Sequence, residues 1–378
     1  MNRQDGPIGY FVHHQGRGHA ERAASIANAM AGRRTVTLFS ARDDIFPALH
    51  GDVSICKIPS LFEPAGEIPP RMSALETPAT MHCAPVGWQT ITSATATLAQ
   101  WFHEAAPALF VTDVSAELGQ FARICSIPHV AVLQHGNRTD PGHQASYDAA
   151  AGLLAPYSKA LEQEDRTPAM IAKTHYAPGV GIALGQFPDK LTARETLGLP
   201  KDREMVLVIA GGGGRGTPSA PLTLGARAEP ETLWVTIGGL ETEWHETPPG
   251  NLQHKGWVDN PEQWVAAADR VVSSCGNTTV HMVLAAGKPW VVVPEWRYFD
   301  EQIYKAQALE RAGVAAVSLH WPSHREGWEK LWQKARGITH AAQTGLFDAD
   351  AAQGAADWLN SLARELWDAE KPRLAVVA

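Results

Sequence analysis

The chain of 378 residues has few cysteines and no pattern that would join them. Its four cysteines, Cys56, Cys83, Cys125 and Cys275, show no C-x-x-C spacing, so neither a zinc ribbon nor a disulfide framework is indicated. The sequence holds no uninterrupted apolar stretch of about 18 residues, so it predicts no transmembrane helix. The first residues, MNRQDGPIGYFVHH, lack the apolar core of a signal peptide, and we therefore expect a cytoplasmic protein.

The chain also has fewer basic residues than acidic ones. The chain has 32 Lys and Arg against 40 Asp and Glu, a formal net charge of −8. A nucleic-acid partner requires a basic surface, and so does adsorption to an anionic membrane by charge alone. We therefore expect no nucleic-acid partner. The content of 44% hydrophobic and 19% charged residues is typical of a soluble globular protein, and the length predicts two domains.

Short apolar runs alternate with helical patterns, which is the rhythm of parallel α/β sheets. In the first half we expect strands at 8–12, 35–40, 109–112 and 129–133, with helices at 20–31, 88–106 and 116–125. In the second half we expect strands at 205–210, 233–237, 253–257, 270–273 and 290–293. An amphipathic helix at about 351–369 closes the chain, and the six prolines of residues 59–87 predict a long irregular loop.

The most informative segment runs from Cys275 to Gln302. Its turn Gly276–Thr279 places backbone N–H groups and hydroxyls at a helix N-terminus, where the peptide dipoles favour the negative charge of a phosphate. The apolar run Trp290–Val293 is typical of a parallel strand buried on both faces. Glu301 and Gln302 follow that strand, in the region where doubly wound sheets bind ligands. The segment predicts a nucleotide-sugar site.

This segment resembles the donor-binding signature of the inverting glycosyltransferases of the GT-B fold. The nearest patterns are those of the UDP-glycosyltransferases and of the peptidoglycan N-acetylglucosaminyltransferase that acts on undecaprenyl-linked muropeptide. The combination that carries the resemblance is a Gly-rich turn with threonines, the AAGKP end of a helix, an apolar strand ending in proline, and a Glu-Gln pair.

The resemblance implies an α/β fold of two Rossmann-like domains that face each other across a cleft. Residues 1–180 would bind the acceptor and residues 181–378 the donor, with the last helix packing back towards the first domain. The implied activity is metal-independent, inverting transfer of a sugar from a nucleotide diphosphate, most simply a UDP-sugar, to a hydroxyl of a small-molecule, lipid-linked or glycan acceptor. The donor is a substrate, so no cofactor is expected. A lipid-linked acceptor would add a peripheral membrane contact.

The resemblance also assigns donor-binding residues. They are Gly211, Gly212, Gly213 and Arg215 of a glycine-rich turn, Trp257 and Val258 near the base, and Cys275, Gly276, Asn277, Thr278, Thr279, Met282, Glu301 and Gln302. The turn lacks the Gly-Lys-Ser/Thr ending of a P-loop, so by itself it is weak evidence for phosphate binding. Trp257 has a competing interpretation as a buried core residue.

Met282 departs from the family pattern. Most relatives have a glutamate at this position that binds both ribose hydroxyls. A thioether is only a weak hydrogen-bond acceptor, so the sequence leaves the nucleotide and the sugar of the donor open.

His19 and Asp113 are the predicted catalytic pair. His19 lies in QGRGHAERA, which resembles family loops whose histidine faces the acceptor, and imidazole is a suitable general base near neutral pH. Asp113 ends a strand, as does the family's aspartate that orients the histidine; such a carboxylate fixes the tautomer and stabilises the imidazolium. The alternatives are that His19 caps a helix after a tight turn and that Asp113 caps the next helix.

Four residues are predicted on the acceptor side: His14, Gly18, His135 and Asn137. His13 and His14 are adjacent at a strand end and should point in opposite directions, so at most one faces the cleft. The run Gln134 to Asn137 resembles an HEQNxxxG motif at the acceptor face of the muropeptide enzyme, although the acidic residue is absent. A simple loop is the alternative.

Two other functions stay open, a nucleotide-sugar epimerase of related fold and a catalytically silent nucleotide-sugar-binding partner subunit. The presence of both His19 and Asp113 favours catalysis. Asp348 and Asp350 have the D-x-D spacing of a metal motif, but they precede a helix and follow no buried strand, so we expect helix capping and no metal site.

Overall fold

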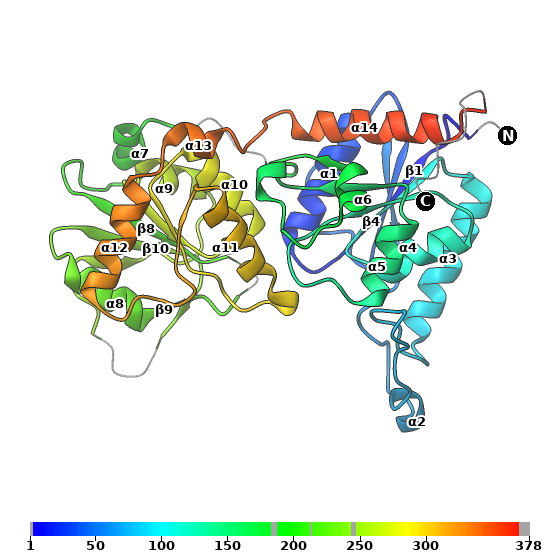
Figure 1. Cartoon of the computed structure of the whole chain (residues 1–378), viewed down its shortest axis with the longest axis horizontal. Helices are drawn as coiled ribbons and strands as arrows, with labels where there is room; N and C mark the ends of the chain where they lie inside the picture. The colour runs from blue at the N-terminus through cyan, green and yellow to red at the C-terminus, as the bar shows by residue number, and fades with distance from the viewer. Residues whose placement is uncertain (1–2, 183–186, 212–213, 243–246, 370–378) are drawn as a thin grey trace.

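The computed structural model describes residues 3–182, 187–211, 214–242 and 247–369. The chain forms two α/β domains side by side, each built on one large sheet (Figure 1). The first sheet has seven strands in the order β3-β2-β1-β4-β5-β6-β7, and the second has six in the order β12-β10-β8-β13-β14-β15. Every pairing within these sheets is parallel across the described residues. The prediction of two Rossmann-like domains is confirmed.

The first domain contains the elements up to β7. Its strands are β1 Ile8–Val12, β2 Val36–Ser40, β3 Val53–Lys57, β4 Leu109–Asp113, β5 His129–Val132, β6 Gly152–Ala155 and β7 Thr174–Tyr176. Its helices are α1 Arg17–Met30, α2 Pro70–Ser73, α3 Gln89–Ala105, α4 Ala116–Ile124, α5 Pro141–Ala149, η1 Lys159–Leu161 and α6 Pro168–Ala172. The four predicted strands are confirmed. The sequence analysis missed β3, which lies at the sheet edge and is mostly exposed, and the short strands β6 and β7.

The second domain begins with α7 Lys190–Thr196. Its strands are β8 Met205–Ile209, β9 Thr217–Pro218, β10 Leu233–Ile237, β11 Leu240–Glu241, β12 Leu252–His254, β13 Arg270–Ser273, β14 Trp290–Val292 and β15 Ala316–Val317. Its helices are α8 Ser219–Ala228, α9 Pro261–Ala267, α10 Asn277–Ala286, η2 Tyr298–Asp300, α11 Glu301–Arg311, α12 Arg325–Arg336 and α13 His340–Thr344. The strand predicted at 253–257 ends earlier, because Gly256 turns the chain with φ +68.

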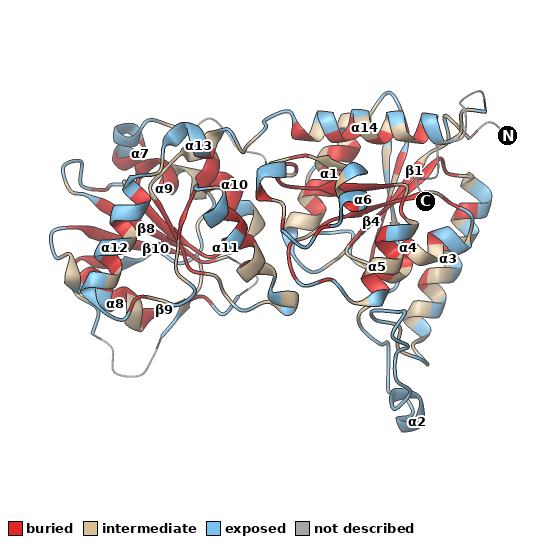
Figure 2. Cartoon of the chain, in the orientation of Figure 1, coloured by how far each residue is buried: buried red, intermediate tan, exposed pale blue. Residues whose placement is uncertain are grey.

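The central strands explain why the sheets form the cores. All residues of β1, β4, β8, β10 and β13 are buried, as expected for strands covered by helices on both faces (Figure 2). Gly9 has a packing role, because a Cβ there would lie 2.7 Å from the Trp101 ring. The buried Trp328 and Trp332 of α12 pack on the second sheet. Among the described residues, no helix combines the length and hydrophobicity needed to cross a bilayer.

The last helix, α14 Ala351–Leu366, lies along α1 of the first domain (Figure 1). Its buried Ala355 and Leu359 join the apolar cluster of that domain. The pair is fixed at one end by Arg34, whose Nε donates to Asn360 at 2.9 Å. The chain therefore crosses between the domains twice, once before α7 and once before α14.

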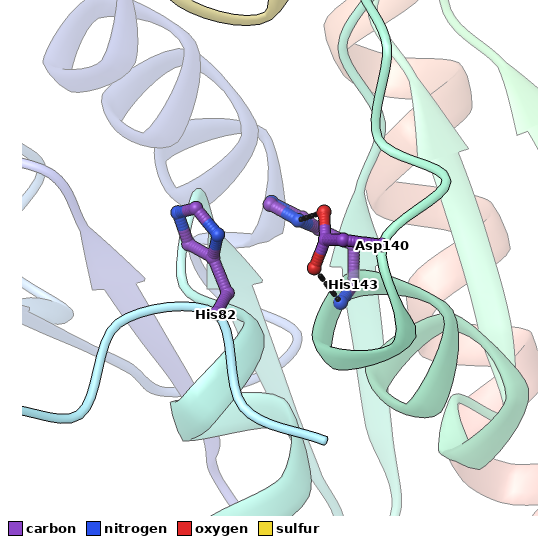
Figure 3. Close-up of side chains that lie close together, drawn as sticks. All are labelled: His82, Asp140 and His143. Atoms are coloured by element: carbon purple, nitrogen blue, oxygen red, sulfur yellow. Dashed lines mark hydrogen bonds and ion pairs between the residues drawn. The ribbon is translucent and has the colours of Figure 1, made fainter. Parts of the chain in front are cut away.

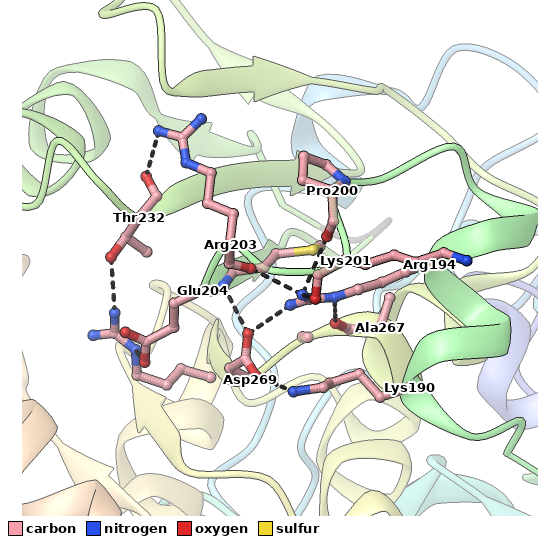
Figure 4. A network of polar contacts seen from close by, with 12 residues as sticks. Lys190, Arg194, Pro200, Lys201, Arg203, Glu204, Thr232, Ala267 and Asp269 are labelled. Carbon is pink, nitrogen blue, oxygen red and sulfur yellow. Dashed lines mark hydrogen bonds and ion pairs between the residues drawn. The ribbon is translucent and has the colours of Figure 1, made fainter.

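A polar network fixes α7 against the base of the second sheet (Figure 4). Arg194 is buried, and its guanidinium donates to the carbonyl of Ala267 at 3.0 Å and to Asp269 Oδ2 at 2.6 Å. Asp269 also accepts from Lys190 Nζ and from the backbone amide of Met205, each at 2.8 Å. Burial opposes ionisation of Asp269, yet these donors lower its pKa. The network anchors the start of the second domain beside β8 and β13.

Candidate active site

A cleft of about 600 Å³ lies between the two domains, at the carboxyl ends of both sheets. The strand order reverses between β1 and β4 in the first sheet and between β8 and β13 in the second, so the loops after these strands diverge and leave a crevice. The lining residues are Gly16, Arg17, Gly18, His19, Arg22, Leu133, Gln134, His135, Pro156, Tyr157, Gly211, Ser274, Cys275, Gly276, Asn277, Thr278, Thr279, Arg297, Glu301, Gln302 and Lys305.

His19 and Asp113 meet on the first-domain side of this cleft. Nδ1 of His19 lies 2.9 Å from Oδ1 of Asp113, and the Asp113 carboxylate is fully buried. Neither residue caps a helix: Gly16 is the N-cap of α1, and Ser115 caps α4 by accepting from Leu118 N. The capping alternatives are therefore wrong. Helix α1 begins at Arg17, three residues earlier than expected, which places His19 in its first turn.

Arg22 joins this pair from the next turn of α1. Its Nε donates to Asp113 Oδ2 at 3.0 Å, and its Nη2 lies 2.8 Å from Oδ1 and 2.7 Å from Oδ2. Burial would raise the pKa of Asp113, but Arg22 and then His19 outweigh it and lower that pKa to about 2. Asp113 is therefore an ionised carboxylate near neutral pH.

The second-domain side presents the N-terminus of α10. Gly276 to Thr279 line the cleft there, as does Gly211 of the loop after β8. Gln302 holds this arrangement together: its Oε1 accepts from Cys275 N at 3.0 Å and from Glu295 N at 2.8 Å. The carboxamide oxygen is thus committed to the protein, and only the amide nitrogen of Gln302 is left for a ligand.

Lys305 and Glu301 place charge beside that helix end. Both line the cleft, Lys305 is buried, and its Nζ lies 3.4 Å from Glu301 Oε1. Burial opposes ionisation of Glu301, but Lys305 first and then Arg138 lower its pKa. The cleft therefore contains an ammonium next to the positive end of a helix dipole, which favours an anionic ligand.

Other predicted donor residues lie away from the cleft lining. Arg215 is exposed, Trp257 is 69% exposed and Val258 packs partly against the core. The interpretation of Trp257 as a core residue is therefore wrong. Met282 is only 3% exposed and belongs to the apolar core of the second domain. Gly212 and Gly213 lie outside the described residues.

Two of the four predicted acceptor residues line the cleft and two do not. Gly18 and His135 line the cleft, whereas His14 and Asn137 are not among its lining residues. Nε2 of His135 lies 2.7 Å from the carbonyl of Leu161, which assigns the proton to Nε2. Burial lowers the pKa of His135 well below its usual value, so the ring is neutral, and its buried Nδ1 has no hydrogen-bond partner among the described residues. This Nδ1 is a free acceptor.

The expectation that His13 and His14 point in opposite directions is wrong. Their rings are stacked, with centroids 5.4 Å apart and planes within 10°. Strand β1 ends at Val12, so both residues belong to a loop in which the alternation of a pleated strand no longer applies. His13 also stacks on Phe62 of the long loop, at 4.2 Å.

The chain is similar to known glycosyltransferases in both sequence and fold. Residues 241–355 match the model of the glycosyltransferase family 28 C-terminal domain. Solved structures with the same architecture include Acinetobacter baumannii MurG (TM-score 0.59, 14% identity, 95% of this chain and 99% of that one). Phytolacca americana UGT2 complexed with UDP-2fluoro-glucose and pterostilbene is similar (TM-score 0.59, 15% identity, 96% and 99%). The fold is GT-B.

A curated glycosyltransferase is also similar to this chain in sequence. Over 178 residues the chain is 28% identical to the UDP-N-acetylglucosamine--N-acetylmuramyl-(pentapeptide) pyrophosphoryl-undecaprenol N-acetylglucosamine transferase of Desulfitobacterium hafniense. The match covers 42% of this chain and 46% of the relative. The chain thus spans about half, or less, of the length of the curated relatives it matches.

Sequence reasoning missed two charged residues of the GT-B cleft, Arg22 and Lys305. Each follows a predicted site residue by one helical turn, Arg22 at three residues from His19 and Lys305 at four from Glu301. Residues three or four apart share a helix face, so this spacing was a usable signal.

One group outside the GT-B cleft has the side chains of a metal site. Ligand atoms of His82, Asp140 and His143 lie within 4.8 Å of one another (Figure 3). His143 Nδ1 is hydrogen-bonded to Asp140 at 2.6 Å, and the buried guanidinium of Arg138 lies 3.4 Å from His143 Nε2. A guanidinium at that distance repels a divalent cation, so we assign no metal here. The group instead packs around Phe299, whose ring centroid is 5.1 Å from His82 and 5.4 Å from His143.

Proposed function

We propose that the chain is an inverting, metal-independent glycosyltransferase that moves a sugar from a nucleoside diphosphate, most simply UDP, to an acceptor hydroxyl. The observation that carries the proposal is the His19–Asp113 pair, held at 2.9 Å on one wall of the cleft, opposite the N-terminus of α10. A general base and an anion-binding helix end on facing walls are the two groups that this transfer requires.

The proposed reaction uses residues on both walls. With Nδ1 of His19 donating to Asp113, Nε2 is free to accept the proton of the acceptor hydroxyl as its oxygen attacks the anomeric carbon. The bond from that carbon to the diphosphate oxygen breaks with inversion. The departing diphosphate gains negative charge, which the N–H groups at the start of α10 and the ammonium of Lys305 would stabilise. Asp113 would stabilise the imidazolium that forms.

The first experiment identifies the donor by measuring the thermal stability of the protein with different nucleotide sugars. A ligand that binds only the native state raises the melting temperature, so a panel of nucleotide sugars ranks the donors without an assay of turnover. Release of the nucleoside diphosphate only in the presence of acceptor supports transfer. Conversion of the donor sugar to an epimer without acceptor would favour the epimerase alternative. Donor binding with neither product would indicate a silent subunit.

The catalytic pair is then tested by single-turnover rates of the parent, His19→Ala, Asp113→Asn and the double variant. Both single changes should slow turnover by about a hundredfold or more with little change in donor affinity. The double variant should lose far less than the product of the two losses, because an absent base cannot be oriented. Near-parental turnover in His19→Ala would refute the assigned base. Turnover lost to a chelator such as EDTA would refute the metal-independent mechanism.

A further inference from the structure

We propose that Arg22 is a positioning residue of the catalytic pair: it fixes the Asp113 carboxylate that orients His19, and its positive charge offsets the negative charge of that carboxylate beside the base. The inference rests on the proposed function in taking His19 as the base. The arrangement of Arg22, Asp113 and His19 is, however, a property of the free protein and can be measured without substrate.

The guanidinium of Arg22 occupies both oxygens of Asp113. Nε and Nη2 make three contacts with the carboxylate of 2.7 to 3.0 Å, which is the two-pronged arrangement that a lysine ammonium cannot reproduce. Arg22 is 4% exposed and Asp113 is fully buried. Water and salt therefore screen this pair little, and the orientation of the carboxylate is set by the protein.

Asp113 and Arg22 are both within hydrogen-bond distance of Nδ1 of His19, and the tautomer of His19 depends on which of them it bonds. Nδ1 of His19 lies 2.9 Å from Asp113 Oδ1 and 3.0 Å from Arg22 Nη2. It either donates to the carboxylate, which leaves Nε2 free as a base, or accepts from Arg22, which puts the proton on Nε2 and removes the base. Arg22 Nη2 lies 2.8 Å and 2.7 Å from the two Asp113 oxygens, closer than to Nδ1 of His19. The ionised carboxylate is also the stronger acceptor, so Arg22 donates to Asp113. We assign the proton to Nδ1.

The charges around His19 decide how readily it takes a second proton. Asp113 favours the imidazolium, and Glu301 adds negative charge from α11 across the cleft. The positive charge of Arg22, on the next turn of α1, opposes both carboxylates. His13, in the loop before α1, has its ring centroid 5.6 Å from that of His19, and Arg17 lines the same cleft. Without Arg22, His19 would face an uncompensated buried carboxylate and would be protonated at higher pH.

The experiment follows the titration of His19 by NMR in protein with ¹⁵N-labelled histidine. The His19 signal is the one that is absent from the spectrum of His19→Gln. In the parent, the ¹⁵N shifts should report a proton on Nδ1. In Arg22→Met, the proton affinity of His19 should rise by about tenfold or more. The matched control is Arg34→Met, which removes another buried arginine of the same domain that contacts Asn360 rather than Asp113. It should leave the titration of His19 unchanged.

The outcomes separate a positioning role from a structural one. An unchanged titration in Arg22→Met, or an equal shift in Arg34→Met, would overturn the inference. If Arg22→Met does not fold, the parent decides the matter: a proton on Nε2 with Nδ1 unprotonated refutes the arrangement, and the reverse supports it. Once an acceptor is known, the acid limb of kcat/KM should move to higher pH in Arg22→Met, while Arg22→Lys should keep the limb and lose turnover. Because the titration needs no substrate, failure of the transferase proposal leaves it interpretable.

Discussion

The carbonyl oxygen of Phe299 accepts a hydrogen bond of 2.7 Å from the backbone amide of Asn137, and this contact joins the two domains beside the cleft. The Phe299 ring also lies over the guanidinium of Arg138, at 4.5 Å. Phe299 and Asp300 both have positive φ, 62° and 52°, which costs roughly 1 to 2 kcal/mol for each residue. Docking of Phe299 on the first domain offsets this strain and sets the position of the following Glu301.

Gly136 is the residue that allows this contact. It has φ +120, and a Cβ there would lie 2.8 Å from the carbonyl oxygen of Phe299. Gly136→Ala should therefore break the contact, open the cleft and reduce turnover by about tenfold or more, since strain at such a position costs about 1 to 3 kcal/mol. Small-angle scattering should show a larger radius of gyration than in the parent. Gly51→Ala, at a site with open space, is the control. A radius of gyration in Gly136→Ala equal to that of the parent and of Gly51→Ala would contradict this role.

Lys305 should recognise the diphosphate of the donor. Its buried ammonium lines the cleft next to the α10 N-terminus, so Lys305→Met should weaken UDP binding by about tenfold to a hundredfold, the range of a charge-assisted hydrogen bond. Calorimetry should show little change for uridine, which has no phosphate. Lys288→Met, which removes a half-buried lysine bonded to the carbonyls of Ala266 and Ala268, should not alter UDP affinity. An equal loss for UDP and uridine would assign Lys305 a structural role.

Met282→Glu tests whether this position can bind ribose. The family pattern suggests that a glutamate would restore two hydrogen bonds, but Met282 is buried in the apolar core and absent from the cleft lining. A carboxylate placed there loses its hydration without a partner, so we expect a loss of several kcal/mol in unfolding free energy and no gain in UDP affinity. Met282→Leu, similar in volume, should cost less than about 1.5 kcal/mol. Parental stability with tighter UDP binding in Met282→Glu would show that the side chain reaches the nucleotide.

Acid should destabilise the fold through its buried histidines. Burial lowers the pKa of His281 to about 4, so its neutral form is favoured in the native state and stability is complete above the unfolded pKa of about 6.5. As pH falls from there towards 4, the unfolded chain binds the proton first. His281 alone should then cost roughly 2 kcal/mol at pH 5. Urea unfolding at pH 7.5 and 5 should show a smaller loss in His281→Gln than in the parent, and no such change in His103→Gln, an exposed site. An identical loss in all three proteins would refute this assignment.

Features that depend on neighbours along the chain could be predicted from the residues alone. The apolar runs predicted the central strands, because a strand buried on both faces needs apolar residues throughout. The glycine turn before α10 and the loop before His19 marked the two walls of the cleft, since each is a strand end followed by a helix start. His19 and Asp113 were predicted together from their local motifs, and the sheet order places them side by side.

Which side chains reach the cleft depends on packing between distant parts of the chain. Arg22 is 91 residues from Asp113, and no local pattern specifies that pair. Met282 and Trp257 matched family positions, yet packing of α10 turns Met282 into the core, and the turn at Gly256 leaves Trp257 exposed. The direction of a helical side chain is fixed by what packs on the helix, and those partners come from distant parts of the chain.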